Sequence, residues 1–176
     1  MELTYKLFDT ILDQKLSIGD LVRSDVAFDP DQSEKRELFM PPALRQTLRQ
    51  IHPRSARDYA ANVRAFLGRY IKDIGIIDNN DYMKSWKEDI FELRVQNQKP
   101  RDRLRIFGAF GRPDTFIAFF RKSRSAFGDK DDPAWDQAIY RTVSEWDAMF
   151  PGCPRVPALP FANCLTFHFF DVHAKD

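Results

Sequence analysis

The chain has 176 residues, of which 43% are hydrophobic and 30% charged, a composition typical of a globular protein and unlike that of fibrous or disordered chains. No apolar run approaches the ~20 residues that a membrane-spanning helix needs. The first residues lack the basic and apolar stretches of a signal peptide, so the cytoplasm is the expected location. Cys153 and Cys164 are expected to stay reduced there, and no Cys/His spacing indicates a zinc site.

Basic residues are concentrated in one segment. Ten Lys and Arg stand against three Asp between Arg94 and Lys130, whereas the whole chain has a net charge of +1. Such an uneven distribution favours one basic surface that could meet a polyphosphate. A solvated face of a sheet would give the same count, so the charge alone leaves both interpretations open.

The first part of the chain is predicted to be a helical extension followed by a linker. Apolar residues recur at helical spacing within residues 1–25: Leu3, Leu7, Ile11 and Leu12. Residues 24–42 contain turn signals and a charged run and end at Pro41-Pro42, as linkers do. We expect the helix to dock on the rest of the molecule or on a second copy, because an isolated short helix is marginal in water. Docked there, it could cover the basic surface.

Two helices are predicted next. A short one begins after Pro42, and a longer one covers residues 55–74 and ends before Gly75. The longer helix has one apolar stripe at i, i+4, i+7 spacing: Tyr59, Val63, Phe66, Leu67, Tyr70 and Ile74.

The periodicity then changes to that of strands. Residues 90–95, 104–110 and 115–120 are rich in β-formers and separated by short turns, which predicts an antiparallel meander. Asp132-Pro133 opens a final helix that ends at Pro151-Gly152. Three prolines make residues 153–160 an extended linker, and residues 165–172 could form a last strand that carries His168.

The order of these elements and four short motifs resemble the RelE/ParE-like toxin superfamily, and within it the HigB-like, phage-derived branch. The motifs are Glu92-Leu93-Arg94, Arg105-Ile106-Phe107, Phe120-Arg121-Lys122-Ser123 and the helical pair Ala138 and Arg141. Phe91 stands where the family has Trp. The resemblance covers roughly residues 50–150.

The resemblance implies an α+β fold in which N-terminal helices pack on a twisted antiparallel sheet. The corresponding domains are an extension and linker at 1–45, the toxin-like domain at 46–152 and a tail at 153–176. The family cleaves messenger RNA on the ribosome without a metal or cofactor, through attack of a 2′-hydroxyl on the neighbouring phosphate. A cognate antitoxin protein silences it. Such a site needs cations to stabilise the phosphate charge and a general acid for the leaving oxygen.

The resemblance also suggests roles for individual residues. Arg105 matches a strand arginine that contacts phosphate, and Lys122 matches the cation that stabilises the transition state. Glu92 matches an acidic residue that acts as a base in some members; as an alternative, it forms an ion pair with neighbouring strands. Further RNA contacts are expected from four arginines: Arg94, Arg103, Arg121 and Arg124.

The general acid has no match at the family's position, and His168 in the unmatched tail is the candidate. Two functional classes therefore stay open. One is an endoribonuclease of a toxin–antitoxin pair. The other is a non-catalytic binding or regulatory protein of phage origin on the same fold, and the sequence leaves open whether the chain is a homodimer.

Overall fold

The computed structural model describes residues 2–24, 36–49, 63, 65–67, 70, 83–95, 103–129, 131–158 and 164–165, with side chains from Tyr5 onward. In chain order the elements are α1 (Glu2–Ser17), β1 (Val22–Arg23), β2 (Glu37–Met40), α2 (Pro42–Arg49), β3 (Met83–Ser85), the 3-10 helix η1 (Lys87–Asp89), β4 (Phe91–Val95), β5 (Leu104–Arg112), β6 (Thr115–Ser123), the 3-10 helix η3 (Arg124–Ala126) and α4 (Pro133–Met149). No helix within these ranges is long and apolar enough to cross a membrane.

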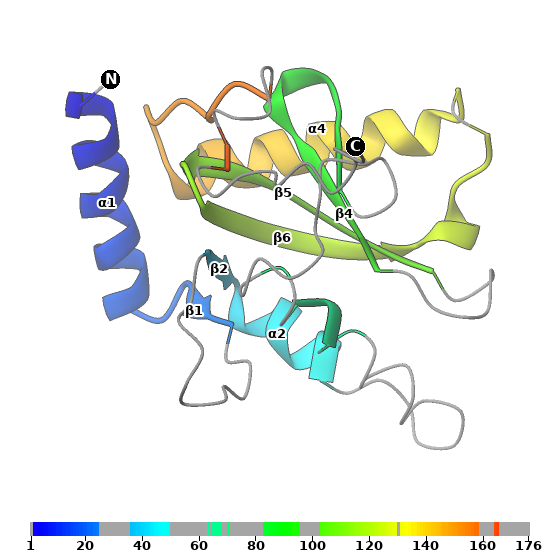
Figure 1. Cartoon of the computed structure of the whole chain (residues 1–176), viewed down its shortest axis with the longest axis horizontal. Helices are drawn as coiled ribbons and strands as arrows, with labels where there is room; N and C mark the ends of the chain where they lie inside the picture. The colour runs from blue at the N-terminus through cyan, green and yellow to red at the C-terminus, as the bar shows by residue number, and fades with distance from the viewer. Residues whose placement is uncertain are drawn as a thin grey trace, which may run out of the picture.

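The strands form one sheet in the order β1-β2-β6-β5-β4-β3 (Figure 1). Its centre is the predicted meander, because β4, β5 and β6 pair antiparallel in sequence order. The tight turn at Pro113-Asp114 joins the two longest strands, and Asp114 adopts a φ of 61° there. The α+β class and these three strands are confirmed.

The prediction of a wholly antiparallel sheet is wrong at β2, which pairs parallel with β6. β2 lies inside the segment predicted to be a linker. Its Leu38 and Met40 are buried on one face of the sheet and Phe39 on the other. A strand buried on both faces has no polar–apolar alternation. In β2 the apolar residues are also few and directly follow a charged segment, so sequence periodicity does not reveal the strand.

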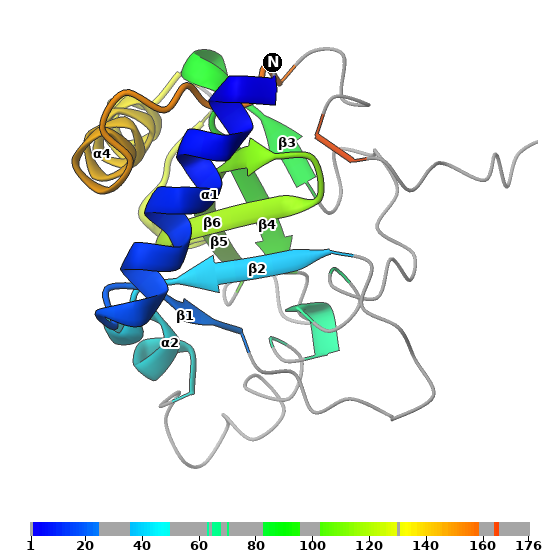
Figure 2. The same cartoon turned by 90° about the vertical axis from the view of Figure 1, so that its left-hand side faces the viewer.

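Both faces of the sheet are covered by helices. On one face α2 and a helical segment pack in a core that includes Val63, Phe66, Leu67 and Tyr70. On the other face lie α1 and α4. Figure 2 shows α4 and the short helical piece at residues 65–67 on opposite sides of the strands. Four residues of the predicted stripe on the 55–74 helix are thus helical and buried: Val63, Phe66, Leu67 and Tyr70. Tyr59 and Ile74 lie outside the described part.

The first helix docks on the molecule as expected: Leu12 is buried and Ile11 packs against the same core, and Phe8 adds a contact that was not predicted. Phe8 is buried against Trp146 and Phe150 of the α4 region, with ring centroids 6.0 and 5.0 Å apart, whereas Leu7 is 44% exposed. Gly111 provides the space, because a Cβ there would collide with the Phe8 ring. Figure 1 shows α1 beside the turn end of the β5–β6 hairpin and η3 at the opposite end.

The last helix is built as the sequence predicts. Asp132 caps its N-terminus by accepting from the Ala134 amide at 2.7 Å, and a proline occupies the first turn. Its apolar stripe is buried on the sheet: Trp135, Ala138, Ile139, Thr142 and Trp146. Residues 153–158 follow without regular structure and bury Val156 and Ala158 in the core. Of the predicted last strand, 165–172, only Leu165 is described.

Candidate nucleic-acid interface

Cations from three adjacent strands stand side by side at one end of the sheet. The register pairs Arg94 with Arg105 and Arg105 with Lys122. Side chains alternate along a strand, so these residues share the α4 face with Phe107 and Phe120. Arg103 precedes β5 and Arg124 follows β6, and the Arg124 amide donates to the Arg103 carbonyl at 2.7 Å. We call Arg94, Arg103, Arg105, Lys122 and Arg124 the basic cluster.

One carboxylate, Glu92, lies beneath the basic cluster and is completely buried. Its Oε2 accepts from the Trp86 indole at 2.8 Å, and its Oε1 accepts from Arg94 Nε at 2.7 Å. Arg105 Nε also lies 2.7 Å from Oε1 as an ion pair. Both carboxylate oxygens are therefore engaged, by Arg94 of the same strand, by Arg105 of the neighbouring β5 and by Trp86 between β3 and η1. The Arg105 contact is the ion pair of the alternative interpretation.

Arg105 is not the exposed phosphate contact that the sequence suggested, because only 5% of it is accessible. The pKa of Arg105 is lowered to about 10, mainly by burial; Glu92 opposes this shift, and the neighbouring cations Arg94, Arg124 and Arg103 contribute to it. A pKa of about 10 still leaves the guanidinium charged at neutral pH. Arg105 is therefore a buried positive charge that pairs with Glu92 and lies next to the other cations of the basic cluster.

The outer members of the basic cluster are half-buried and held by aromatic rings. Lys122 Nζ lies 4.6 Å above the Phe127 ring, and the Arg124 guanidinium lies 5.3 Å above that of Trp135. Arg124 also donates to the carbonyls of Phe127 and Gly128 at 2.7 and 3.0 Å. These contacts restrict the side chains before any ligand arrives, which lowers the entropy cost of binding.

Arg121 belongs to the opposite side of β6. It is exposed, and it alternates with Phe120 and Lys122 along the strand. It lines a groove between α2 and α4 instead of joining the basic cluster. The sequence prediction grouped Arg121 with Arg124, and the structure separates the two.

The acid–base partner required for RNA cleavage is not assembled within the described residues. His168 lies outside them, as do the other two histidines of the chain, His52 and His173. Tyr140 is 54% exposed on α4, where its hydroxyl accepts from Lys87 at 3.4 Å. The described part therefore offers cations for a phosphate and no group placed to move a proton.

The described residues contain no group of three or more His, Cys, Asp or Glu side chains that could hold a metal ion. Cys153 and Cys164 are free and buried. Burial raises the pKa of Cys164 to about 12, with smaller contributions from Asp89 and Asp114.

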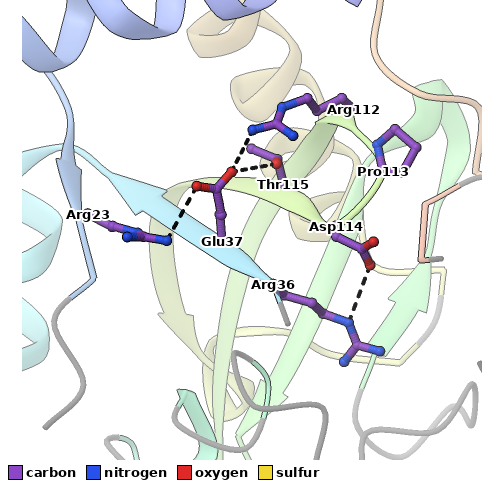
Figure 3. A pocket seen from close by; sticks show the side chains of 7 residues that line it. All are labelled: Arg23, Arg36, Glu37, Arg112, Pro113, Asp114 and Thr115. Carbon is purple, nitrogen blue, oxygen red and sulfur yellow. Dashed lines mark hydrogen bonds and ion pairs between the residues drawn. The ribbon is translucent and has the colours of Figure 1, made fainter. Parts of the chain in front are cut away.

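A second group of charges lies at the other end of the sheet, around a pocket of about 390 Å³ (Figure 3). At its centre Glu37 accepts from Arg23, Arg112 and Thr115 at 3.3, 2.7 and 3.0 Å. Arg36 faces Asp114 across 3.7 Å, as Figure 3 shows.

Each guanidinium of this pocket has a carboxylate partner, and Arg112 adds one on α1, Asp9, at 2.9 Å. The network therefore fastens β1, β2, α1 and the β5–β6 turn to one another and leaves little charge for an anion. The sequence prediction placed Arg36 and Glu37 in a linker, since nothing in a charged run reveals that Arg36 will be buried.

Comparisons with protein-family models, with curated proteins and with solved structures find no match to this chain.

Proposed function

We propose that the protein binds RNA through the basic cluster and does not cleave it. The observation that carries the proposal is the charge of that cluster: four arginines and a lysine surround the Glu92 carboxylate, which is buried and already paired. Asp132, which caps α4, is a second described carboxylate that interacts with the cluster, through Lys122 and Arg124. The five cations still exceed these two carboxylates by three charges.

Phosphate is the ligand chemistry that suits this arrangement. Guanidinium groups offer paired donors in the geometry of phosphate oxygens. Arg103, Lys122 and Arg124 are the accessible donors, and Arg94 and Arg105 supply charge behind them. RNA is the polyphosphate that the resemblance to the RelE/ParE-like toxins suggests.

The state of Glu92 argues for binding without cleavage. Attack by a 2′-hydroxyl needs a base within hydrogen-bond reach. Glu92 is closed to solvent and fully engaged by Trp86, Arg94 and Arg105. On this proposal the chain has a toxin-like fold without catalytic activity, and it recognises RNA without cutting it.

One observation favours the second function, an endoribonuclease of a toxin–antitoxin pair acting on the ribosome. Lys122 lies in direct register with Arg105, so two cations stand together as a phosphoryl-transfer site requires. Cleavage would take its acid and base from outside the described residues, with His168 as the candidate acid.

The two functions separate in one experiment with purified protein and an end-labelled single-stranded RNA. Binding is followed by fluorescence anisotropy and the length of the recovered RNA on a denaturing gel. We expect saturable binding and full-length RNA after prolonged incubation, whether or not the RNA carries 2′-O-methyl groups. Cleavage that the 2′-O-methyl groups prevent would establish the second function, and absence of binding would refute both.

A further inference from the structure

Among the described residues, a strand covers only the first half of the β6 edge that faces β2. β2 pairs with Thr115, Phe116 and Ile117, and then the chain turns at Pro41 into α2. β6 continues to Ser123, and no strand in the described ranges pairs with this second half on that side. An open strand edge exposes unpaired backbone amides and carbonyls to any extended chain that can reach them.

The backbone of this edge has a defined orientation. The Arg124 amide donates to the Arg103 carbonyl, so this pair is a hydrogen-bonded one in the β5–β6 ladder. Hydrogen-bonded and non-hydrogen-bonded pairs alternate in an antiparallel ladder. Ser123, one residue before Arg124, pairs with Leu104 and is therefore in a non-hydrogen-bonded pair. The pair of Arg121 and Ile106, two residues further back, is also non-hydrogen-bonded. The amide and carbonyl groups of Arg121 and Ser123 therefore point away from β5, towards the open edge.

The open edge forms the floor of a groove of about 660 Å³, the edge groove. α2 borders it with Pro41, Ala43, Leu44 and Thr47, and α4 borders it with Arg141 and Glu145. The floor is the run from Phe119 to Ser123. Five residues of strand span about 16 Å, enough for an added strand of similar length.

The charges of the edge groove select its occupant. Arg121 and Arg141 are exposed and Lys122 is half-buried, against a single acidic residue, Glu145. Arg141 pairs with Glu145 at 3.5 Å and also lies over the Phe120 ring, with its guanidinium carbon 4.5 Å from the centroid. An extended peptide would meet a largely apolar wall at α2 and an excess of positive charge on the floor and at α4.

We propose that the edge groove binds an extended acidic segment of another protein, which adds to β6 as a strand. Backbone hydrogen bonds to Arg121 and Ser123 hold the segment, and acidic side chains pair with Arg121, Lys122 and Arg141. Strand addition of this kind takes its affinity from main-chain bonds and its specificity from side-chain contacts. The proposal differs from RNA binding because it uses the backbone of the edge; Lys122 is the one residue of the basic cluster that also lines the edge groove.

The test uses a labelled nine-residue peptide of alternating valine and glutamate and the full-length protein, followed by fluorescence anisotropy. A peptide with lysine in place of glutamate is the control for charge. We expect the acidic peptide to bind and the basic one to bind at least tenfold more weakly. Equal binding of the two peptides, or no binding of the acidic one, would overturn the proposal.

Ser123 offers a matched pair of variants. Its φ of −66° is the value that proline imposes, and its amide faces the edge, so Ser123→Pro removes an edge donor without breaking the β5–β6 ladder. Ser123→Ala is the control, since both variants lose the side-chain cap on the Ser125 amide. We expect Ser123→Pro to bind the acidic peptide about tenfold more weakly than Ser123→Ala does, as the loss of one hydrogen bond to a buried partner implies.

Methylation of alternate peptide amides repeats the test without changing the protein. Methyl groups on the set of amides that faces β6 should abolish binding, and methyl groups on the other set should leave it unchanged. Equal effects of both sets would refute strand addition. RNA affinity should be the same for Ser123→Pro and Ser123→Ala; if these variants differ in RNA binding and bind the peptide equally, nucleic acid is the occupant and the proposal is wrong.

Discussion

Replacing Arg105 with alanine should destabilise the fold, although the residue lies in the most basic part of the chain. The guanidinium is 6% exposed and pairs with Glu92, which is fully buried, at 2.7 Å. Removing one partner of a buried ion pair costs about 3–5 kcal/mol, because the other charge stays in the interior uncompensated. Arg94 and Trp86 still contact Glu92, so we expect the lower end of that range, about 3 kcal/mol.

A loss of this size is measurable by denaturant or thermal unfolding. It corresponds to roughly a hundredfold change in the folding equilibrium. For a chain of this length it lowers Tm by about 6–12 °C. Lys122→Ala is the matched control: this side chain is the register neighbour of Arg105, but it is half-buried and its described contact is with the Phe127 ring. We expect a change of less than about 1 kcal/mol there.

A double-mutant cycle with Glu92→Gln isolates the pair. The two single variants and the double variant should show a coupling free energy of about 1–3 kcal/mol between Glu92 and Arg105. Arg105→Ala that unfolds at the same denaturant concentration as the wild type, or a coupling near zero, would refute the view that this arginine is a buried partner of Glu92.

Three further predictions concern other parts of the fold. Cys153 and Cys164 are buried, and burial raises the pKa of both thiols, so a thiol reagent at pH 8 should label neither in the native protein and both in denaturant; rapid native labelling would contradict this packing. Hydrogen bonds from the amides of Ala134 and Gly128 hold the pKa of Asp132 below its ordinary value of 3.8. The Asp132 carboxylate therefore stabilises the fold above that value, and this stabilisation is lost as the pH falls through the folded-state pKa. Asp132→Asn should remove this part of the acid dependence of Tm. Gly111→Val should displace α1, because a Cβ there meets the Phe8 ring, and faster proteolysis of the N-terminal helix than in the wild type would report it.

The elements that sequence alone predicts are those with clear local signals. β5 and β6 are rich in β-formers and flank the turn at Pro113-Asp114, and α4 has a capping aspartate, a proline and an apolar stripe. β2 has none of these signals. It is a short strand, and its burial depends on α2, on β6 and on helices from both faces, which no local window contains.

The candidate site follows the same division. The density of basic residues and the strand alternation predict that Arg94, Arg105 and Lys122 stand together, because register and side-chain direction are local consequences of a meander. The burial of Arg105 and the closure of Glu92 depend on Trp86, which reaches the carboxylate from outside β4. A tryptophan six residues before a strand glutamate carries no periodic signal, so the sequence does not distinguish a base from an anchored ion pair.

The position of α1 also could not be inferred from its own pattern. One expectation from the sequence was that the first helix covers the basic surface. The structure places it at the turn end of the β5–β6 hairpin, through Phe8 and Gly111, about 20 Å along the strand from Arg105 at ~3.3 Å per residue. Deleting α1 should therefore not uncover the basic cluster.

The salt dependence of RNA affinity tests most directly whether the basic cluster binds the phosphate backbone. The affinity of each protein for a single-stranded RNA is measured over a series of salt concentrations. Each phosphate contact contributes about 0.7 to the slope of log K against log salt, so Arg103→Ala with Lys122→Ala should lower the slope by about 1.4. Lys6→Ala with Lys15→Ala removes the same charge from α1, at the other end of the strands, and should leave the slope nearly unchanged. Equal slopes for the two double variants would show that RNA is attracted by the overall charge alone and would contradict a defined site at the basic cluster.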